Sequence, residues 1–241
     1  MKSLTSFLAT TVIGLTTALT VGAQGLNFAS TPGSTIQFNG NGSSFQFNSS
    51  TSPVFGGIFS GTQWLVGSQT GGTGVATGLL GWFNSSPLQN SPFSYGTITT
   101  VISGSSVDES ALITGPIAGL QINDGSGFNL TGNINWGEIS THNYLGGINA
   151  TLAVNITGLN YAGINPDLMA IAEGGSAAMD LTFQFAPGMS LADLTSGSGP
   201  YQTSYSGSLA TVVPEPTSIG CLLLGLGILT VARRAKQNQR S

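Results

Sequence analysis

The central part of this 241-residue chain has no positively charged side chain. The five Lys and Arg residues all lie near the two ends, at Lys2, Arg233, Arg234, Lys236 and Arg240. A surface without cations cannot neutralise phosphates, which excludes nucleic acid as a partner. It also lacks the Lys or Arg clamp that phosphoryl transfer uses.

Cysteine and histidine are almost absent as well. The one cysteine, Cys221, lies in an apolar run near the C-terminus, so the central part has no disulfide and no thiolate zinc site. The one histidine is His142. Charged residues make up only 6% of the chain, whereas Gly occurs 36 times. This composition differs from that of charge-rich disordered chains and suits a β domain with many turns.

The first 23 residues have the organisation of a secretory signal. Lys2 provides the positive start, and an apolar stretch follows from Leu4 to Val21. Val21, Gly22 and Ala23 are small residues at the positions that a signal peptidase requires. We therefore predict export and cleavage after Ala23.

The last thirty residues, 212–241, contain a predicted transmembrane helix at 217–232. At about 1.5 Å per residue, this segment spans roughly 24 Å, slightly less than a typical hydrocarbon core. Arg233, Arg234 and Lys236 follow it directly. Positive charge on this side alone places the C-terminus in the cytoplasm and the rest of the chain outside the inner membrane.

The same segment resembles a named sorting signal. The Pro214-Glu215-Pro216 triplet, the Leu- and Gly-rich span and the Arg233-Arg234 pair occur in the order found in PEP-CTERM proteins of bacteria. That resemblance implies recognition by an exosortase, processing near the triplet, and association with exopolysaccharide or biofilm at the cell surface. Tails that resemble this one are also called ice-binding protein C-terminal domains, a name that does not imply ice binding.

Residues 24–211 alternate between apolar and polar side chains in short runs. Runs at 35–39 and 44–48 flank Asn39-Gly40-Asn41-Gly42 and predict a hairpin, and 148–159 predicts a half-buried strand. Short helices are expected at 165–174 and 190–194. About ten to twelve strands with frequent turns predict an all-β, antiparallel β-sandwich of jelly-roll type with one or two short helices. The signal helix and the transmembrane helix complete the expected architecture.

Candidate chemical groups in this domain are few, and we predict that it is not an enzyme. His142 has no nucleophile motif near it and is interpreted as a residue of a loop or strand end. Asp108 and Glu109 are neighbours, so on a strand they would face opposite sides, and a solvated loop is the favoured interpretation.

Two further groups have a structural and a binding interpretation. Residues 123–127 (Asn-Asp-Gly-Ser-Gly) resemble part of a calcium loop but lack the later Glu, so we favour a hairpin turn and expect no cofactor, with calcium left open. Trp64, Trp82 and Trp136 would stack on sugars if exposed in a row, but core packing is expected.

We therefore expect a non-enzymatic, exported protein of the cell surface or extracellular matrix. Its expected partners are signal peptidase, an exosortase, the inner membrane during transit, and exopolysaccharide. A secreted polysaccharide-active enzyme, with two of the eight acids of the domain facing each other, and a purely structural or adhesive matrix protein are the alternatives.

Overall fold

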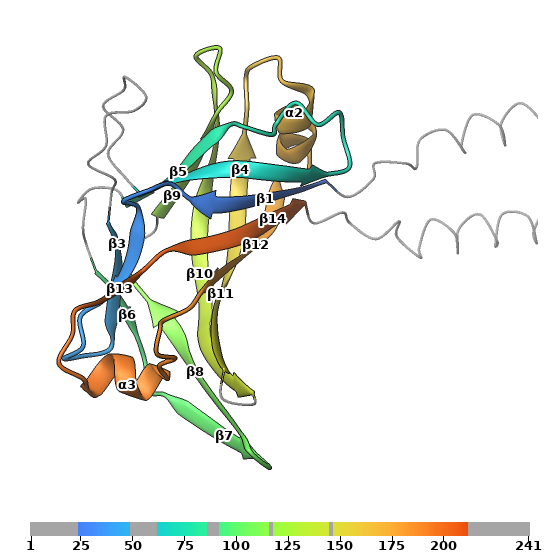
Figure 1. Cartoon of the computed structure of the whole chain (residues 1–241). Coiled ribbons are helices and arrows are strands. Elements are labelled where there is room, and N and C mark those ends of the chain that lie inside the picture. Colours follow the sequence, from blue (N-terminus) through green and yellow to red (C-terminus); the bar gives the residue numbers. More distant parts are fainter. Residues whose placement is uncertain (1–23, 49–61, 86–91, 116–117, 145–146, 212–241) are drawn as a thin grey trace, which may run out of the picture. The chain divides into compact units, whose positions relative to one another are not determined.

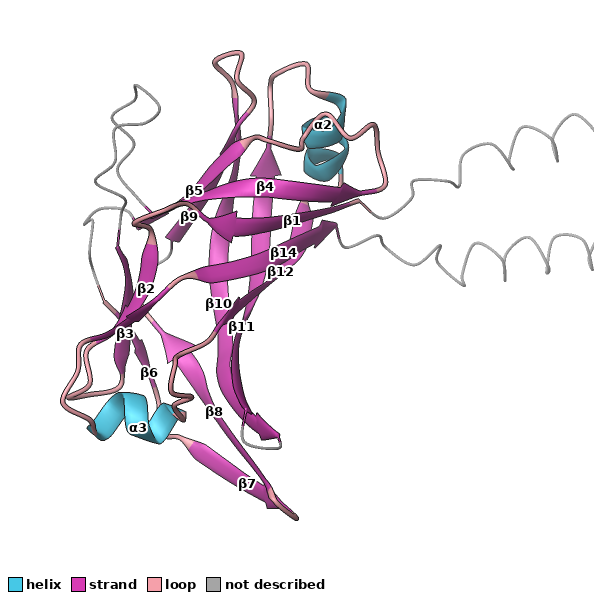
Figure 2. Ribbon diagram, in the orientation of Figure 1, coloured by secondary structure: helices cyan, strands magenta, loops and turns pink. Residues whose placement is uncertain are grey.

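The computed structural model describes residues 24–48, 62–85, 92–115, 118–144 and 147–211. Within them, fourteen strands pair antiparallel throughout and two short helices connect strands (Figure 2). The all-β antiparallel class is confirmed. The jelly-roll-like sandwich is not confirmed, because eight strands close on themselves as a barrel.

The barrel strands follow one another around the ring in sequence order. They are β1 (Gly25–Ser30), β4 (Thr62–Thr70), β5 (Leu80–Ser85), β9 (Ala118–Asn123), β10 (Asn129–Tyr144), β11 (Gly147–Asn160), β12 (Ser176–Phe183) and β14 (Tyr205–Thr211). The last of them, β14, pairs with β1 in the register Gly25 to Ala210, which closes the ring. Strand β10 also pairs with β11, so each of the eight barrel strands has a paired neighbour on both sides.

Because neighbouring strands are antiparallel, the connections between them alternate between the two ends of the barrel. One end, called here the α2 end, carries the β4–β5 loop, the β9–β10 turn and helix α2 (Pro166–Glu173) (Figure 1). Gln24 and Thr211, the first and last described residues, also lie there and are hydrogen-bonded to each other. The described chain therefore enters and leaves the barrel at the α2 end.

The connections at the opposite end are longer and build a second sheet. Its strands are β13 (Tyr201–Thr203), β2 (Thr35–Phe38), β3 (Ser44–Asn48), β6 (Phe93–Tyr95) and β8 (Ser106–Thr114), in that spatial order. Strand β8 also pairs with β7 (Thr99–Ser103) and with the far half of β10, and helix α3 (Leu191–Ser196) precedes β13. The long strand β10 thus pairs first with β9 and then with β8 along the same edge.

Several local predictions are confirmed. The β2–β3 hairpin forms around Gly40 and Gly42, whose positive φ angles of 77° and 150° suit glycine. Helix α2 begins after Asn165, whose side chain accepts hydrogen bonds from two backbone N–H groups. Helix α3 has a capping box in which Ser190 and Asp193 satisfy each other's backbone N–H groups.

Two regions differ from the prediction. The sequence after the Gly-rich turn at 71–74 predicts a strand over 75–83, but residues 71–79 form a loop in which Gly74 and Gly78 have φ angles of 84° and 88°. The expected solvated loop around Asp108 and Glu109 is strand β8 instead, and its Glu109 is buried.

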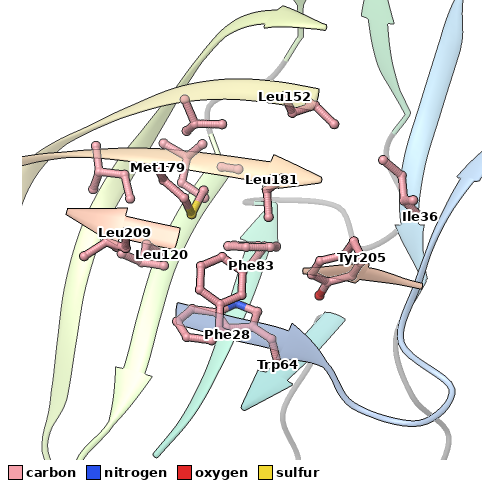
Figure 3. Close-up of a cluster of buried hydrophobic side chains, with 14 of the residues drawn as sticks. Phe28, Ile36, Trp64, Phe83, Leu120, Leu152, Met179, Leu181, Tyr205 and Leu209 are labelled. Atoms are coloured by element: carbon pink, nitrogen blue, oxygen red, sulfur yellow. The ribbon is translucent and has the colours of Figure 1, made fainter. Parts of the chain in front are cut away.

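One apolar core extends through the barrel and into the second sheet. Phe28, Trp64 and Phe83 converge from β1, β4 and β5, with ring centroids 4.3 Å apart for Phe28–Trp64 and 5.8 Å apart for Trp64–Phe83 (Figure 3). Each fully buried side chain of this size contributes about 1.5–3 kcal/mol. Since the described residues include no Lys or Arg, burial and backbone hydrogen bonds supply the stability.

The predicted signal at 1–23 with its cleavage site at Ala23, and the predicted tail at 212–241, lie outside the described residues. So do Pro214, Glu215, Pro216, Arg233, Arg234 and Lys236. Among the helices in the described part of the chain, none has the length and apolar character needed to cross a membrane.

Candidate functional site

The outward face of the barrel is built from hydroxyl and amide side chains. On β12 the alternation is strict, because Met179 and Leu181 are buried while Asp180 and Thr182 are exposed. Neighbouring strands continue the pattern with paired polar groups: Asn27 donates to Ser68 at 3.1 Å, and Asn135 donates to Thr157 at 2.9 Å. This surface can form many hydrogen bonds and carries little charge.

A groove of about 700 Å³ opens where β1, β12 and β14 approach the second sheet. Its polar lining comes from Ser30, Thr182, Gln184, Ser204 and Ser206, and its other lining residues are Ala29, Ala150, Phe183 and Tyr205. None of these side chains is a carboxylate or a cation. Its volume lies within the range of about 300–1,000 Å³ that small-molecule sites occupy.

The pairing of β14 with both of its neighbours, β12 and β1, creates much of this lining. Thr182 lies opposite Ser206 on β14, and their hydroxyls are 3.0 Å apart. The Ser30 hydroxyl accepts the backbone N–H of Tyr205 at 3.2 Å. Gln184 and Ser204 are both exposed, so the Gln184 amide and the Ser204 hydroxyl are accessible to a ligand.

The Tyr205 phenol beside the groove remains neutral. Burial raises its pKa far above the usual value, and a hydrogen bond with Thr62 at 3.0 Å only partly opposes this effect. The groove therefore gains no charge in the physiological pH range, and recognition there depends on hydrogen bonds and apolar contact.

A second hollow of about 260 Å³ lies on the same outward face, over β7, β8, β10 and β11. Its lining includes His142, Asp108 and Ser140. The Nδ1 atom of His142 is 3.4 Å from an Asp108 oxygen, and its Nε2 atom is 3.4 Å from the Ser140 hydroxyl. The structure thus brings together an acid, a histidine and a serine that sequence analysis had not connected.

This trio has the order of a hydrolytic triad but not its setting. Ser140 lies in the middle of paired strands, whose backbone N–H groups serve the sheet and are not gathered as oxyanion donors. Its hydroxyl is closer to Thr151, at 2.8 Å, than to His142. The trio is best described as a polar surface cluster.

A glycosidase would need two carboxyl groups facing each other at about 5–9.5 Å. Asp108 on β8 pairs with His142 on β10, and Glu138 lies four residues before His142 on β10. The backbones of Asp108 and Glu138 are therefore about 13 Å apart along the strand direction. Glu138 and Asp180 are outward-facing residues on either side of β11, and two strand spacings put their backbones about 10 Å apart. The 260 Å³ hollow is lined by Glu138 but not by Asp180.

The calcium-loop candidate at 123–127 is a turn between β9 and β10. Asp124 accepts the backbone N–H groups of Ser126 and Phe128 and, at 2.7 Å, the phenol of Tyr161. Burial raises its pKa, but these hydrogen bonds outweigh burial and lower the pKa overall. In the part of the chain that the structure describes, no three His, Cys, Asp or Glu residues gather as metal ligands.

The three tryptophans do not form an exposed row. Trp64 and Trp82 are buried, and Trp136 packs among Phe47 and Phe93 with ring centroids 5.7 and 4.8 Å apart. The expectation that they serve packing is confirmed. Sugar stacking on them is not supported.

No family model, curated protein or solved structure matches this chain. Sequence analysis missed the groove because its polar residues come from distant segments and form no motif. The only available signal was the alternation in 178–186, which places Thr182 and Gln184 on the polar face.

Proposed function

We propose that this chain is an exported, non-enzymatic protein that binds neutral polysaccharide at the cell surface or in the extracellular matrix. The observation that carries the proposal is the uncharged groove of about 700 Å³, lined by hydroxyl and amide groups. Sugars present hydroxyl groups that pair with these side chains, and no ionic group is needed. The PEP-CTERM resemblance of the tail supports delivery by an exosortase to an exopolysaccharide matrix.

Binding is tested with the purified full chain on a panel of neutral polysaccharides, including the matrix of the cells that produce it. Because no charged group lines the groove, we expect affinity to change by less than about twofold between low and high salt. Absence of binding to every polysaccharide of the panel would overturn the proposal. Self-association without binding would favour the structural or adhesive alternative.

Removing the two available polar groups should weaken this binding. The double substitution Gln184→Ala and Ser204→Ala is expected to reduce affinity about tenfold, since two neutral hydrogen bonds contribute about 1–2 kcal/mol together. Isothermal titration calorimetry measures the change. Gln121→Ala with Ser126→Ala is the matched control, because these residues do not line the groove. Equal affinities of the two double variants would exclude the groove as the site.

The enzymatic alternative makes a different prediction in the same assay. Release of reducing ends from a polysaccharide, abolished by Glu138→Gln or Asp180→Asn, would establish hydrolysis. Binding without such release supports the non-enzymatic proposal.

Sorting is tested by the mass of the surface form. We expect it to lack residues 1–23 and the residues beyond the Pro214-Glu215-Pro216 motif. Replacing all three motif residues with Ala should leave the tail attached. The control is Glu173→Ala, which also removes one negative charge but lies on α2, and its tail should still be removed. Mass spectrometry of the surface fraction distinguishes these outcomes, and a wild-type mass that retains Arg240 would indicate a permanent anchor instead.

A further inference from the structure

Four apolar side chains are exposed on three separate connections at the α2 end. They are Val75 in the β4–β5 loop, Phe128 at the β9–β10 turn, and Ile164 and Met169 in the segment that contains α2. Ile164 is 83% exposed and the other three are between 42% and 50% exposed. We call these four residues the loop rim.

Hydrogen bonds hold the connections of the loop rim together. The buried carboxylate of Asp167 accepts the backbone N–H groups of Thr73 and Val75 at 2.7 and 2.9 Å, which fixes the β4–β5 loop to α2. Tyr161 donates to Asp124 at 2.7 Å and accepts the Asn165 N–H at 2.9 Å, which fixes the β9–β10 turn to the same segment. The four apolar side chains are therefore presented on a braced scaffold.

The chain also leaves the barrel at this end. Thr211 donates its backbone N–H to the Gln24 carbonyl at 2.9 Å, so its position is fixed at the α2 end. The apolar run of the tail begins at Ile219, after seven intervening residues. Even fully extended, seven residues span only about 25 Å. If the tail spans the membrane, the α2 end lies within that distance of the lipid surface.

We propose that the loop rim docks on the outer surface of the membrane that holds the tail. This inference rests on the membrane role of the tail in the proposed function. Docking would bury apolar side chains at the headgroup boundary without help from charge, because the domain has no cation to attract anionic lipids. The tether keeps the rim at a high local concentration, so weak intrinsic affinity is sufficient.

This orientation has a consequence for the glycan groove. Ser30 and Ser206 line the groove at the far ends of β1 and β14, away from Gln24 and Thr211. The six residues of β1 span about 20 Å between the two ends. A docked rim would therefore hold the groove away from the membrane and open to the matrix.

The test uses the full chain in phosphatidylcholine vesicles, with Cys221→Ser and one new cysteine that carries an environment-sensitive fluorophore. The new cysteine is Ile164→Cys in the rim or, as the control, Leu112→Cys, which is 70% exposed on β8 of the second sheet. Lipids carrying a headgroup-level quencher should quench the label at position 164 at least about twofold more than the label at 112. Raising the salt concentration should not reduce this difference.

Substitutions in the rim test whether its apolar side chains cause the docking. Phe128→Asp with Met169→Asp should abolish the excess quenching at position 164, whereas Leu112→Asp should not. Thermal unfolding followed by circular dichroism establishes that each variant is folded. Replacing phosphatidylcholine with phosphatidylglycerol should weaken docking at low salt, because the domain carries only negative charge.

Vesicle flotation distinguishes a failure of rim docking from a failure of the membrane role of the tail. A chain that floats with vesicles but shows equal quenching at 164 and 112 would overturn rim docking and leave the membrane role of the tail intact. A chain that does not float would overturn both. Excess quenching that is lost in high salt would also overturn docking by apolar contact.

Discussion

Replacing Gly81 with alanine is expected to destabilise the domain by about 3 kcal/mol, near the upper end of the usual cost of overpacking. A Cβ atom at this position would overlap the indole ring of Trp64, which lies against the Gly81 backbone across the β4–β5 pair. Trp64 is fully buried and its ring packs against those of Phe28 and Phe83, so a shift of the indole would disturb both contacts. Chemical denaturation measures the loss, which should appear as a lower midpoint with an unchanged slope.

Gly67→Ala is the matched control for this prediction. Gly67 lies on the same strand as Trp64, and a Cβ there would come no closer than 3.9 Å, to the Asn27 carbonyl oxygen. We expect its effect to stay within about 0.5 kcal/mol. Similar destabilisation by both substitutions would mean that the loss comes from a general effect of adding a methyl group to these paired strands and not from overlap with the ring.

A double-mutant cycle with Trp64→Phe isolates the overlap. The smaller ring leaves room for the alanine methyl group, so Gly81→Ala should cost at least about 1 kcal/mol less in that background. Trp64→Phe itself should be mild for so buried a residue, because the indole Nε1 atom is buried without a hydrogen-bond partner in the described structure. Additive effects would argue against direct overlap.

Replacing Asp167 with asparagine is expected to cost about 2–3 kcal/mol at neutral pH, as the loss of charge-assisted hydrogen bonds in a buried site usually does. Asp167 is 1% exposed and accepts hydrogen bonds from the backbone N–H groups of Thr73 and Val75 and from the Thr73 hydroxyl. An asparagine at this position would place its NH₂ donor against the backbone N–H groups of Thr73 and Val75, which are donors as well. Denaturation at pH 7 measures this cost. Glu173→Gln, at the other end of the same helix and exposed, is the control and should be nearly neutral.

The same carboxylate makes stability depend on pH. Burial raises the pKa of Asp167, but the hydrogen bonds from Thr73, Gln69 and Val75 outweigh burial, and the folded-state pKa lies below the usual value. Its contribution is therefore fully present above the unfolded pKa of about 3.9 and is lost as the pH falls from there through the folded pKa.

Acid denaturation distinguishes the two chains. Below about pH 4 the wild-type chain should lose stability more steeply than Asp167→Asn, so that the difference between them narrows. A difference that stays constant down to pH 2 would show that the carboxylate is not the group responsible. The pKa of Asp124 is also lowered, and this residue is present in both chains. The stability of Asp167→Asn should therefore still fall in acid, but less than that of the wild type.

Short-range features of this chain were predictable because neighbouring residues determine them. Asn165 and Ser190 cap helices through their own side chains, and Gly40 and Gly42 permit the β2–β3 turn. The alternation in β11 and β12 shows which side chains enter the core. Each of these signals lies within about ten residues of sequence.

Asp108 and Glu109 illustrate where local interpretation fails. Two adjacent acids favour a solvated loop, yet β8 pairs with β10, and Glu109 becomes buried beside α3, where its carboxylate accepts the Ala192 N–H at 2.9 Å. That partner is 83 residues away along the chain. The strand predicted over 75–83 fails for a similar reason, because the loop at 71–79 is held by hydrogen bonds to Asp167 in α2, 94 and 92 residues away along the chain.

The sequence by itself determined that the domain is antiparallel β, that its surface carries few charges and no Lys or Arg, and that export and membrane signals are expected at the two ends. Only the tertiary structure decided that the strands close as a barrel, because a sandwich and a barrel require the same alternation and differ in whether β14 pairs with β1. It also decided where the polar groups gather. Ser30, Thr182 and Ser206 line one groove because strands that are far apart in sequence are neighbours in the ring.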